Sequence, residues 1–232
     1  MPTTVRGPSA PSVAAPRPST DTVRASPSSG SPPVALWRTV LTVAWLSVLL
    51  GFAIEALLLG LAAATGGLAS PRPFVADLIS KVSWSVVVCV GISLGTAVGR
   101  ARPTAMGVLG LLSAPAGFAI AKTVQKGVSA ALGLAAAAGG PSPWLVAGLK
   151  ALQYGIFGTV TGKLSSRRAG LLAYALTGAA TGVVLGGLLV ALLARSGGDS
   201  AATIVARAVD EVAFPIGCAL VLYVAENLTP AR

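Results

Sequence analysis

Histidine is absent from this chain of 232 residues, and acidic residues, aromatic residues and cysteine are scarce. Without histidine the chain offers no imidazole base, no histidine ligand for haem and none of the common histidine-containing zinc sets. The phosphate-binding motif Gly-x-x-x-x-Gly-Lys-Ser/Thr and the dinucleotide-binding motif Gly-x-Gly-x-x-Gly do not occur either. We therefore expect a protein that is not an enzyme and that holds no metal and no cofactor. A serine–lysine pair is the open alternative, because Ser80, Ser83 and Ser129 lie near lysines.

Charge is also scarce: charged residues make up 10% of the chain and hydrophobic residues 54%, with a mean hydropathy of +0.80. A single soluble core cannot bury so much apolar surface. A helix that crosses a membrane needs about 20 apolar residues. Such runs occupy residues 37–64, 79–99, 104–131, 144–163, 169–194 and 203–227. The sequence thus predicts an all-α, multi-pass bundle of six transmembrane helices in a lipid bilayer.

The third of these runs contains a proline, Pro115, and two lysines, Lys122 and Lys126. A proline inside a helix removes a backbone donor and favours a kink. The third span is therefore either one continuous helix or a helix that is broken between Pro115 and Lys126. Pro215, in the last run, predicts a second kink, and either proline can serve as a hinge or a static bend.

The first 35 residues have a different composition, rich in proline, serine, threonine and alanine. Such a segment is predicted to be disordered. It is too long and polar for the start of a signal peptide, so we expect the first span to be retained. With this tail inside the cell, ten of the 17 basic residues lie on the cytoplasmic side. Both termini are therefore predicted to be cytoplasmic, in a bacterial inner (plasma) membrane. The net charge of +10 follows from this topology, and no nucleic-acid partner is expected.

A weak internal repeat divides the apolar part of the chain into three. The segment Gly51-Phe52-Ala53-Ile54 recurs 66 positions later at residues 117–120, and a looser echo follows at residues 182–185. The period is that of one helical hairpin. The repeat predicts that the domain 36–232 consists of three hairpins, residues 36–100, 101–167 and 168–230, around a pseudo-threefold axis.

Glycines at intervals of four form a second pattern, in three of the six runs. Small residues at this spacing let transmembrane helices approach closely. We expect this glycine zipper to pack helices, either within one bundle or in a homo-oligomer or a complex with another membrane protein. The glycines are Gly91, Gly95, Gly99, Gly158, Gly162, Gly178, Gly182 and Gly186.

Charged residues inside the predicted spans are the candidates for function, because an ionisable group in hydrocarbon is costly unless it is paired or hydrated. With the topology above, eight of them fall in the middle or the outward half of the membrane. They are Glu55, Lys81, Lys122, Lys126, Lys150, Arg207, Asp210 and Glu211. The excess of bases over acids indicates an anionic or proton-coupled solute or ion.

Two interpretations of these charges remain open. Lysines and arginines near span ends can simply extend to the headgroups, which fits Lys81, Lys126, Lys150 and Arg207. Glu55 lies deeper and requires a proton, a water-filled cavity or a basic partner, and the repeat places it beside Lys122. The leading hypothesis is a small membrane protein that binds or passes a solute at these residues.

The alternative function is a membrane scaffold, regulatory anchor or assembly factor that acts through partners. In that case the N-terminal tail recruits a cytoplasmic protein and the glycine faces dock another membrane protein. Cys89 and Cys218 occupy equivalent positions in the repeat, so a contact between them is conceivable. No disulfide is indicated, and both are expected to be small buried side chains.

Overall fold

The computed structural model describes residue 3 and residues 32–65, 71–134, 142–195 and 200–228. The predicted disordered tail therefore lies almost wholly outside the described residues. The described part is helical and contains no strand, which confirms the all-α class. Its elements are α1 (Pro32–Ala64), α2 (Pro71–Leu94), the 3₁₀ helix η1 (Gly95–Ala101), α3 (Arg102–Ala131), α4 (Pro143–Ser166), α5 (Leu171–Thr181), the π-helical segment η2 (Gly182–Gly186), α6 (Gly187–Arg195) and α7 (Ala201–Leu228).

Five helices in the described part are long and apolar enough to cross a membrane, one fewer than the sequence predicts. They are Leu36–Ala64, Pro73–Val98, Arg102–Ala131, Leu171–Arg195 and Ala201–Leu228. The helix that falls short is α4, because Lys150, Gln153 and several glycines and threonines lower its hydropathy. Its polar residues are largely buried against neighbouring helices, and Gln153 is only 1% exposed. The arrangement of six spans as three repeats stays a prediction.

The third predicted span is one continuous helix, α3, with Pro115 inside it. The second span differs from the prediction at its start. Its helix, α2, begins at Pro71, eight residues earlier than the apolar run, because proline is well suited to the first turn of a helix. This extra length brings Asp77 into the bundle.

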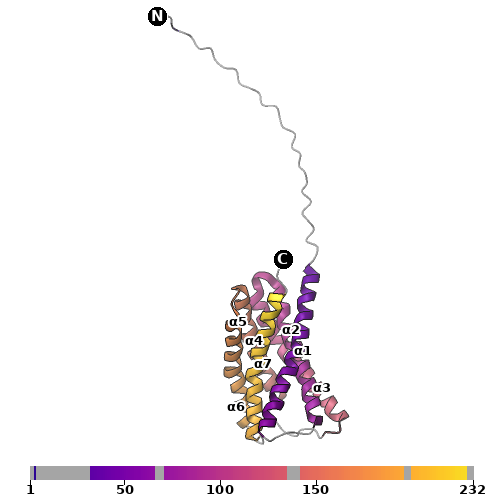
Figure 1. Ribbon diagram of the computed structural model, residues 1–232. Helices are drawn as coiled ribbons and strands as arrows, with labels where there is room; N and C mark the ends of the chain where they lie inside the picture. The colour runs from indigo at the N-terminus through magenta and orange to yellow at the C-terminus, as the bar shows by residue number, and fades with distance from the viewer. Residues whose placement is uncertain (1–2, 4–31, 66–70, 135–141, 196–199, 229–232) are drawn as a thin grey trace. The chain divides into compact units, whose positions relative to one another are not determined.

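Within residues 32–228 each helix packs against the next one along the chain, and α1 also packs against α7. Figure 1 shows α5, η2 and α6 in line as one helix, and with these counted as one, successive helices run in opposite directions. The start of α1 and the end of α7 lie at the same end of the bundle. We call this the terminal end, and the other the loop end. Which membrane face each end contacts stays a prediction.

The outer face of the bundle is apolar. Large side chains such as Trp45, Leu172 and Val184 are each more than 60% exposed. A soluble protein rarely exposes so many contiguous apolar side chains. Lipid is the environment that this surface fits.

The zipper glycines in the described part face neighbouring helices of the same bundle. A Cβ atom on Gly91 of α2 or on Gly95, the first residue of η1, would collide with α3, and one on Gly158 or Gly162 of α4 would also collide with α3. A Cβ atom on Gly178, Gly182 or Gly186 would collide with α7. These seven glycines are thus occupied by contacts within the chain, while the surroundings of Gly99 lie outside the described part.

Candidate functional site: a charged layer toward the loop end

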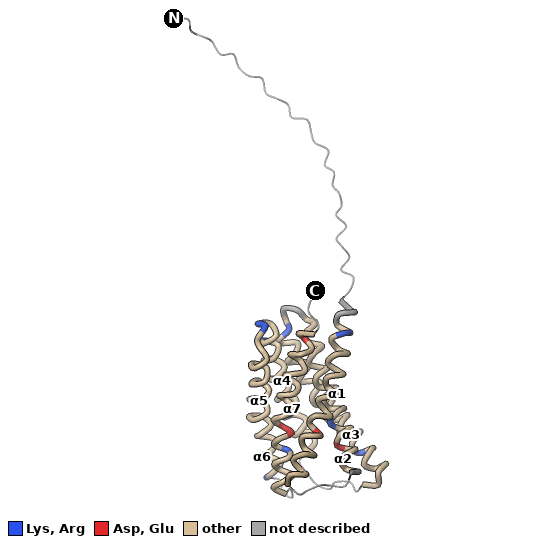
Figure 2. Tube along the Cα trace, viewed as in Figure 1, with Lys and Arg blue, Asp and Glu red and all other residues tan. Residues whose placement is uncertain are grey.

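Nine charged residues form a layer toward the loop end of the bundle, which we call the charged layer. In Figure 2 the charged segments form two bands, separated by an uncharged middle. The charged layer consists of the eight predicted residues and Asp77, which lies one helical turn before Lys81 in α2. The members are Glu55 from α1, Asp77 and Lys81 from α2, Lys122 and Lys126 from α3, Lys150 from α4, and Arg207, Asp210 and Glu211 from α7.

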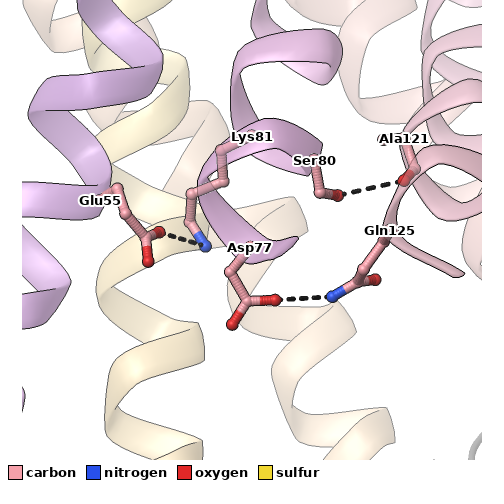
Figure 3. Close-up of polar contacts among 6 residues, drawn as sticks. All are labelled: Glu55, Asp77, Ser80, Lys81, Ala121 and Gln125. Atoms are coloured by element: carbon pink, nitrogen blue, oxygen red, sulfur yellow. Dashed lines mark hydrogen bonds and ion pairs between the residues drawn. The ribbon is translucent and has the colours of Figure 1, made fainter. Parts of the chain in front are cut away.

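The first ion pair of the layer joins α1 to α2. The Oε2 atom of Glu55 lies 3.1 Å from Nζ of Lys81, and Figure 3 shows the two side chains pointing toward one another. Glu55 is buried, with 6% of its surface exposed. One turn earlier, Gly51 lets α1 approach the backbone of Val82 closely. The deep carboxylate therefore has a basic partner, which is Lys81 of the same hairpin rather than Lys122.

The second ion pair joins α4 to α7. Nζ of Lys150 lies 2.6 Å from Oε1 and 2.5 Å from Oε2 of Glu211, and both side chains are nearly buried. The ammonium group also lies 5.4 Å from the ring centre of Trp84 and 6.0 Å from that of Tyr154. Both distances are within the range of cation–π attraction. Lys81 and Lys150 are thus held inside the bundle by carboxylates, which differs from the interpretation that they extend to the headgroups.

A third polar chain joins α2 to α3. The amide of Gln125 donates to Oδ1 of Asp77 at 2.6 Å (Figure 3). Nζ of Lys122 donates to Oε1 of Gln125 at 3.0 Å. Above it, Ser80 donates to the carbonyl of Ala121 at 3.3 Å. The hydroxyl of Ser80 is therefore used as a link between helices.

Asp210 directly precedes Glu211 in α7 and is half-buried. The Oδ1 atom of Asp210 and the hydroxyl oxygen of Tyr154 are buried and have no hydrogen-bond partner in the structure. Buried polar atoms without a hydrogen-bond partner are rare in native proteins.

The buried and the exposed residues of the charged layer differ in net charge. Lys122 and Lys126 are exposed, whereas the other seven charged residues of the layer are buried or half-buried. The enclosed part therefore contains four acids, Glu55 and Asp77 with Asp210 and Glu211, against three bases. The excess of bases that the sequence indicates belongs to the exposed rim on α3, and the interior has a formal excess of one negative charge.

Aromatic side chains pack together in the bundle core. The ring of Trp84 in α2 lies 5.6 Å from that of Tyr154 in α4 and 5.9 Å from that of Phe214 in α7. Next to them, the sulfur atoms of Cys89 and Cys218 lie 2.9 Å apart, and both thiols are free and buried. The two cysteines are thus in contact, as their equivalent positions in the repeat suggested. The helices that meet here, α2, α4 and α7, are the second members of the three predicted hairpins.

A second polar cluster, which sequence reasoning missed, lies toward the terminal end. Arg102 donates to Oγ of Ser165 at 2.7 Å, Ser165 donates to Glu226 at 2.6 Å, and the hydroxyl of Tyr174 donates to the same carboxylate at 3.0 Å. Four helices, α3, α4, α5 and α7, are joined by these three bonds. A charged residue in the last turns of a span, such as Glu226, looks interfacial in sequence, so only its partners show that it is structural.

The chain contains one short sequence that matches a hydrolase motif, but this sequence lies within helices. Residues 91–95 read Gly-Ile-Ser-Leu-Gly, which matches the Gly-x-Ser-x-Gly pattern of α/β-hydrolases. That pattern requires a turn between a strand and a helix, whereas here it lies at the end of α2 and the start of η1. Ser93 is buried and donates to the carbonyl of Val90 at 2.8 Å.

Five helices long and apolar enough to span a membrane, with an apolar outer face, define the chain as an integral membrane protein of the α-helical class. No protein-family model matches the chain, and neither the comparison with curated proteins nor that with solved structures found a match. The charged layer is therefore the main guide to function.

Proposed function

We propose that this protein binds a small solute or ion at the charged layer and moves it across the membrane in exchange for, or together with, protons. The observation that carries the proposal is the pair of enclosed lysine–carboxylate ion pairs, contributed by four different helices near one end of the bundle. Ionisable groups inside a membrane protein are expensive to retain and commonly mark ion or proton pathways.

A contribution to stability does not by itself explain why the chain contains these two ion pairs. Well-packed apolar residues usually replace a buried ion pair without loss of stability, because desolvation offsets most of the attraction. The two pairs also connect different helices, α1 to α2 and α4 to α7. Adding a proton to Glu55 or Glu211 would release its lysine and loosen one helix contact. Such coupling between protonation and helix packing is what a proton-linked carrier requires.

The aromatic core and the terminal-end cluster supply the barrier that a carrier also needs. Trp84, Tyr154 and Phe214 pack against one another in the core, and the Ser165–Glu226 bonds tie four helices near the other end. A solute that enters from the loop end would therefore reach the charged layer and stop there until the helices move.

The alternative is a scaffold or anchor that acts through a partner, and one observation favours it. An apolar groove of about 430 Å³ runs between α3 and α4, with Gly107, Leu111, Gly155 and Ile156 among its lining residues. Faces with small residues are where transmembrane helices dock. A second membrane protein, or a second copy of this chain, would fit such a groove.

Flux in proteoliposomes tests the proposal. A panel of inorganic ions, small acids and small amines is added outside vesicles that contain a pH-sensitive dye, and wild type is compared with Glu55→Gln. The matched control is Lys163→Gln, an exposed residue of α4 outside the charged layer. We expect solute-dependent proton movement in wild type and the control, and its loss in Glu55→Gln. Folded wild-type protein that moves no proton with any member of the panel would instead favour the scaffold.

Removal of residues 1–31 separates the same two functions. A carrier whose machinery lies in α1–α7 keeps its flux without this segment. An anchor that recruits a cytoplasmic protein through the segment loses that partner, which a pull-down with the segment alone would detect.

A further inference from the structure

The ammonium group of Lys150 occupies a site with the features of a receptor for a small organic cation. Both oxygens of Glu211 accept hydrogen bonds from it, and the rings of Trp84 and Tyr154 lie within 6.0 Å. A carboxylate combined with aromatic faces is how proteins recognise ammonium groups. Lys150 reaches this site on a flexible stem, so the cation that fills the site is part of the chain.

The site offers more binding groups than Lys150 uses. The Oδ1 atom of Asp210, which directly precedes Glu211 in α7, and the hydroxyl of Tyr154 are buried without hydrogen-bond partners among the described residues. Both atoms can therefore form hydrogen bonds that Lys150 does not use. The formal negative excess of the enclosed charged layer also favours a cation over an anion.

The helix opposite Glu211 is irregular at this level. A Cβ atom on Gly186, in the π-helical segment η2, would meet the Cβ atom of Glu211 at 2.8 Å. Single-turn π segments inside α-helices occur frequently at functional sites. The carboxylate that holds Lys150 thus packs directly against a segment whose hydrogen bonding departs from the regular pattern.

We propose that Lys150 is a tethered cation, which holds the place of a small organic cation that binds by displacing it from Glu211. The inference rests on the proposed function and names its substrate class: small ammonium compounds, for which methylammonium is the simplest probe. Aromatic faces favour such ions over strongly hydrated inorganic ones. The described residues also contain no group of three or more acidic or cysteine side chains placed to hold a metal ion.

The decisive measurement is the binding of methylammonium to the purified full-length protein by titration calorimetry. Wild type is expected to bind it saturably, and Lys150→Ala at least about tenfold more tightly, because the internal competitor has gone. Trp84→Leu in the otherwise unchanged chain is expected to weaken binding by about 2- to 30-fold through the lost cation–π attraction. Lys150→Ala combined with Glu211→Gln, which removes both tether and carboxylate, is expected to abolish binding.

The direction of the Lys150→Ala effect separates this role from others. If Lys150 attracts an anion or only stabilises the bundle, its removal weakens binding or leaves it unchanged, and either result overturns the proposal. Wild type that binds no methylammonium also overturns it. Should Lys150→Ala fail to fold, wild type and Trp84→Leu decide the question.

Failure of this inference differs from failure of the proposed function. Proton movement with another solute, without methylammonium binding, removes the substrate class and leaves the carrier. Methylammonium binding in the absence of any flux leaves the site and removes the carrier.

Discussion

Replacing Lys150 with methionine keeps most of the side-chain volume and removes its charge, which leaves Glu211 inside the bundle without its partner. The two side chains are 13% and 12% exposed, so solvent screens them little. Removing one member of a buried ion pair costs about 3 to 5 kcal/mol, mainly because the other charge stays desolvated. For a chain of this size each kcal/mol corresponds to about 2 to 4 °C in Tm. The expected loss is therefore on the order of 6 to 20 °C.

Thermal unfolding in detergent, followed by circular dichroism, measures this loss. The matched control is Lys163→Met, which removes an exposed lysine of the same helix and should change Tm by no more than about 2 °C. Combining Lys150→Met with Glu211→Leu removes both charges and should recover most of the stability. Equal Tm values for Lys150→Met and Lys163→Met would refute the reasoning. So would a double variant whose loss of Tm equals the sum of the losses in Lys150→Met and Glu211→Leu.

Three further predictions concern the packing around the charged layer and beyond it. Gly186→Ala should destabilise the protein by about 1 to 3 kcal/mol, because the added Cβ atom would overlap α7. Gly187→Ala is the control: the space around Gly187 is open, so this change should be neutral or stabilising by up to about 1 kcal/mol. Thermal unfolding compares the two variants. Oxidation with copper phenanthroline should join Cys89 to Cys218 within one chain, seen as the loss of two hydrogen atoms in the intact mass, and an unchanged mass would contradict their contact. Ser165→Ala should cost about 1 to 3 kcal/mol, because it leaves the half-buried carboxylate of Glu226 with one donor fewer. An unchanged Tm would show that the terminal-end cluster contributes nothing.

Hydropathy predicted the helices well and their partners poorly. The predicted run 104–131 differs from α3 by two residues at its start, because apolar composition and length decide which segments enter lipid. The start of α2 was missed because Arg72 and Asp77 lower the hydropathy of a segment that is nevertheless helical. A hydropathy scan reports the environment of a segment and carries no information about a helix that begins in a polar region.

The sequence predicted how deep in the membrane the charged residues lie, but not which of them contact one another. The position of Glu55 in its span called for a proton, a water-filled cavity or a basic partner, and in the structure Lys81 is such a partner. The identity of the partner depends on how α1 and α2 are rotated about their axes, which the repeat alignment with Lys122 did not capture. The spacing of Asp77 and Lys81, one helical turn apart, was the available indication that α2 carries both signs of charge. The four-helix cluster around Glu226 had no comparable pattern, because its members are far apart in sequence.

The central claim is that the enclosed ion pairs serve movement of a solute and protons rather than stability. The most direct test combines Glu55→Leu with Lys81→Met, which removes one pair without leaving a lone charge. The double variant should melt at or above the Tm of wild type, yet lose solute-dependent proton movement in proteoliposomes. A double variant that is equally stable and still moves protons at the wild-type rate would contradict the claim.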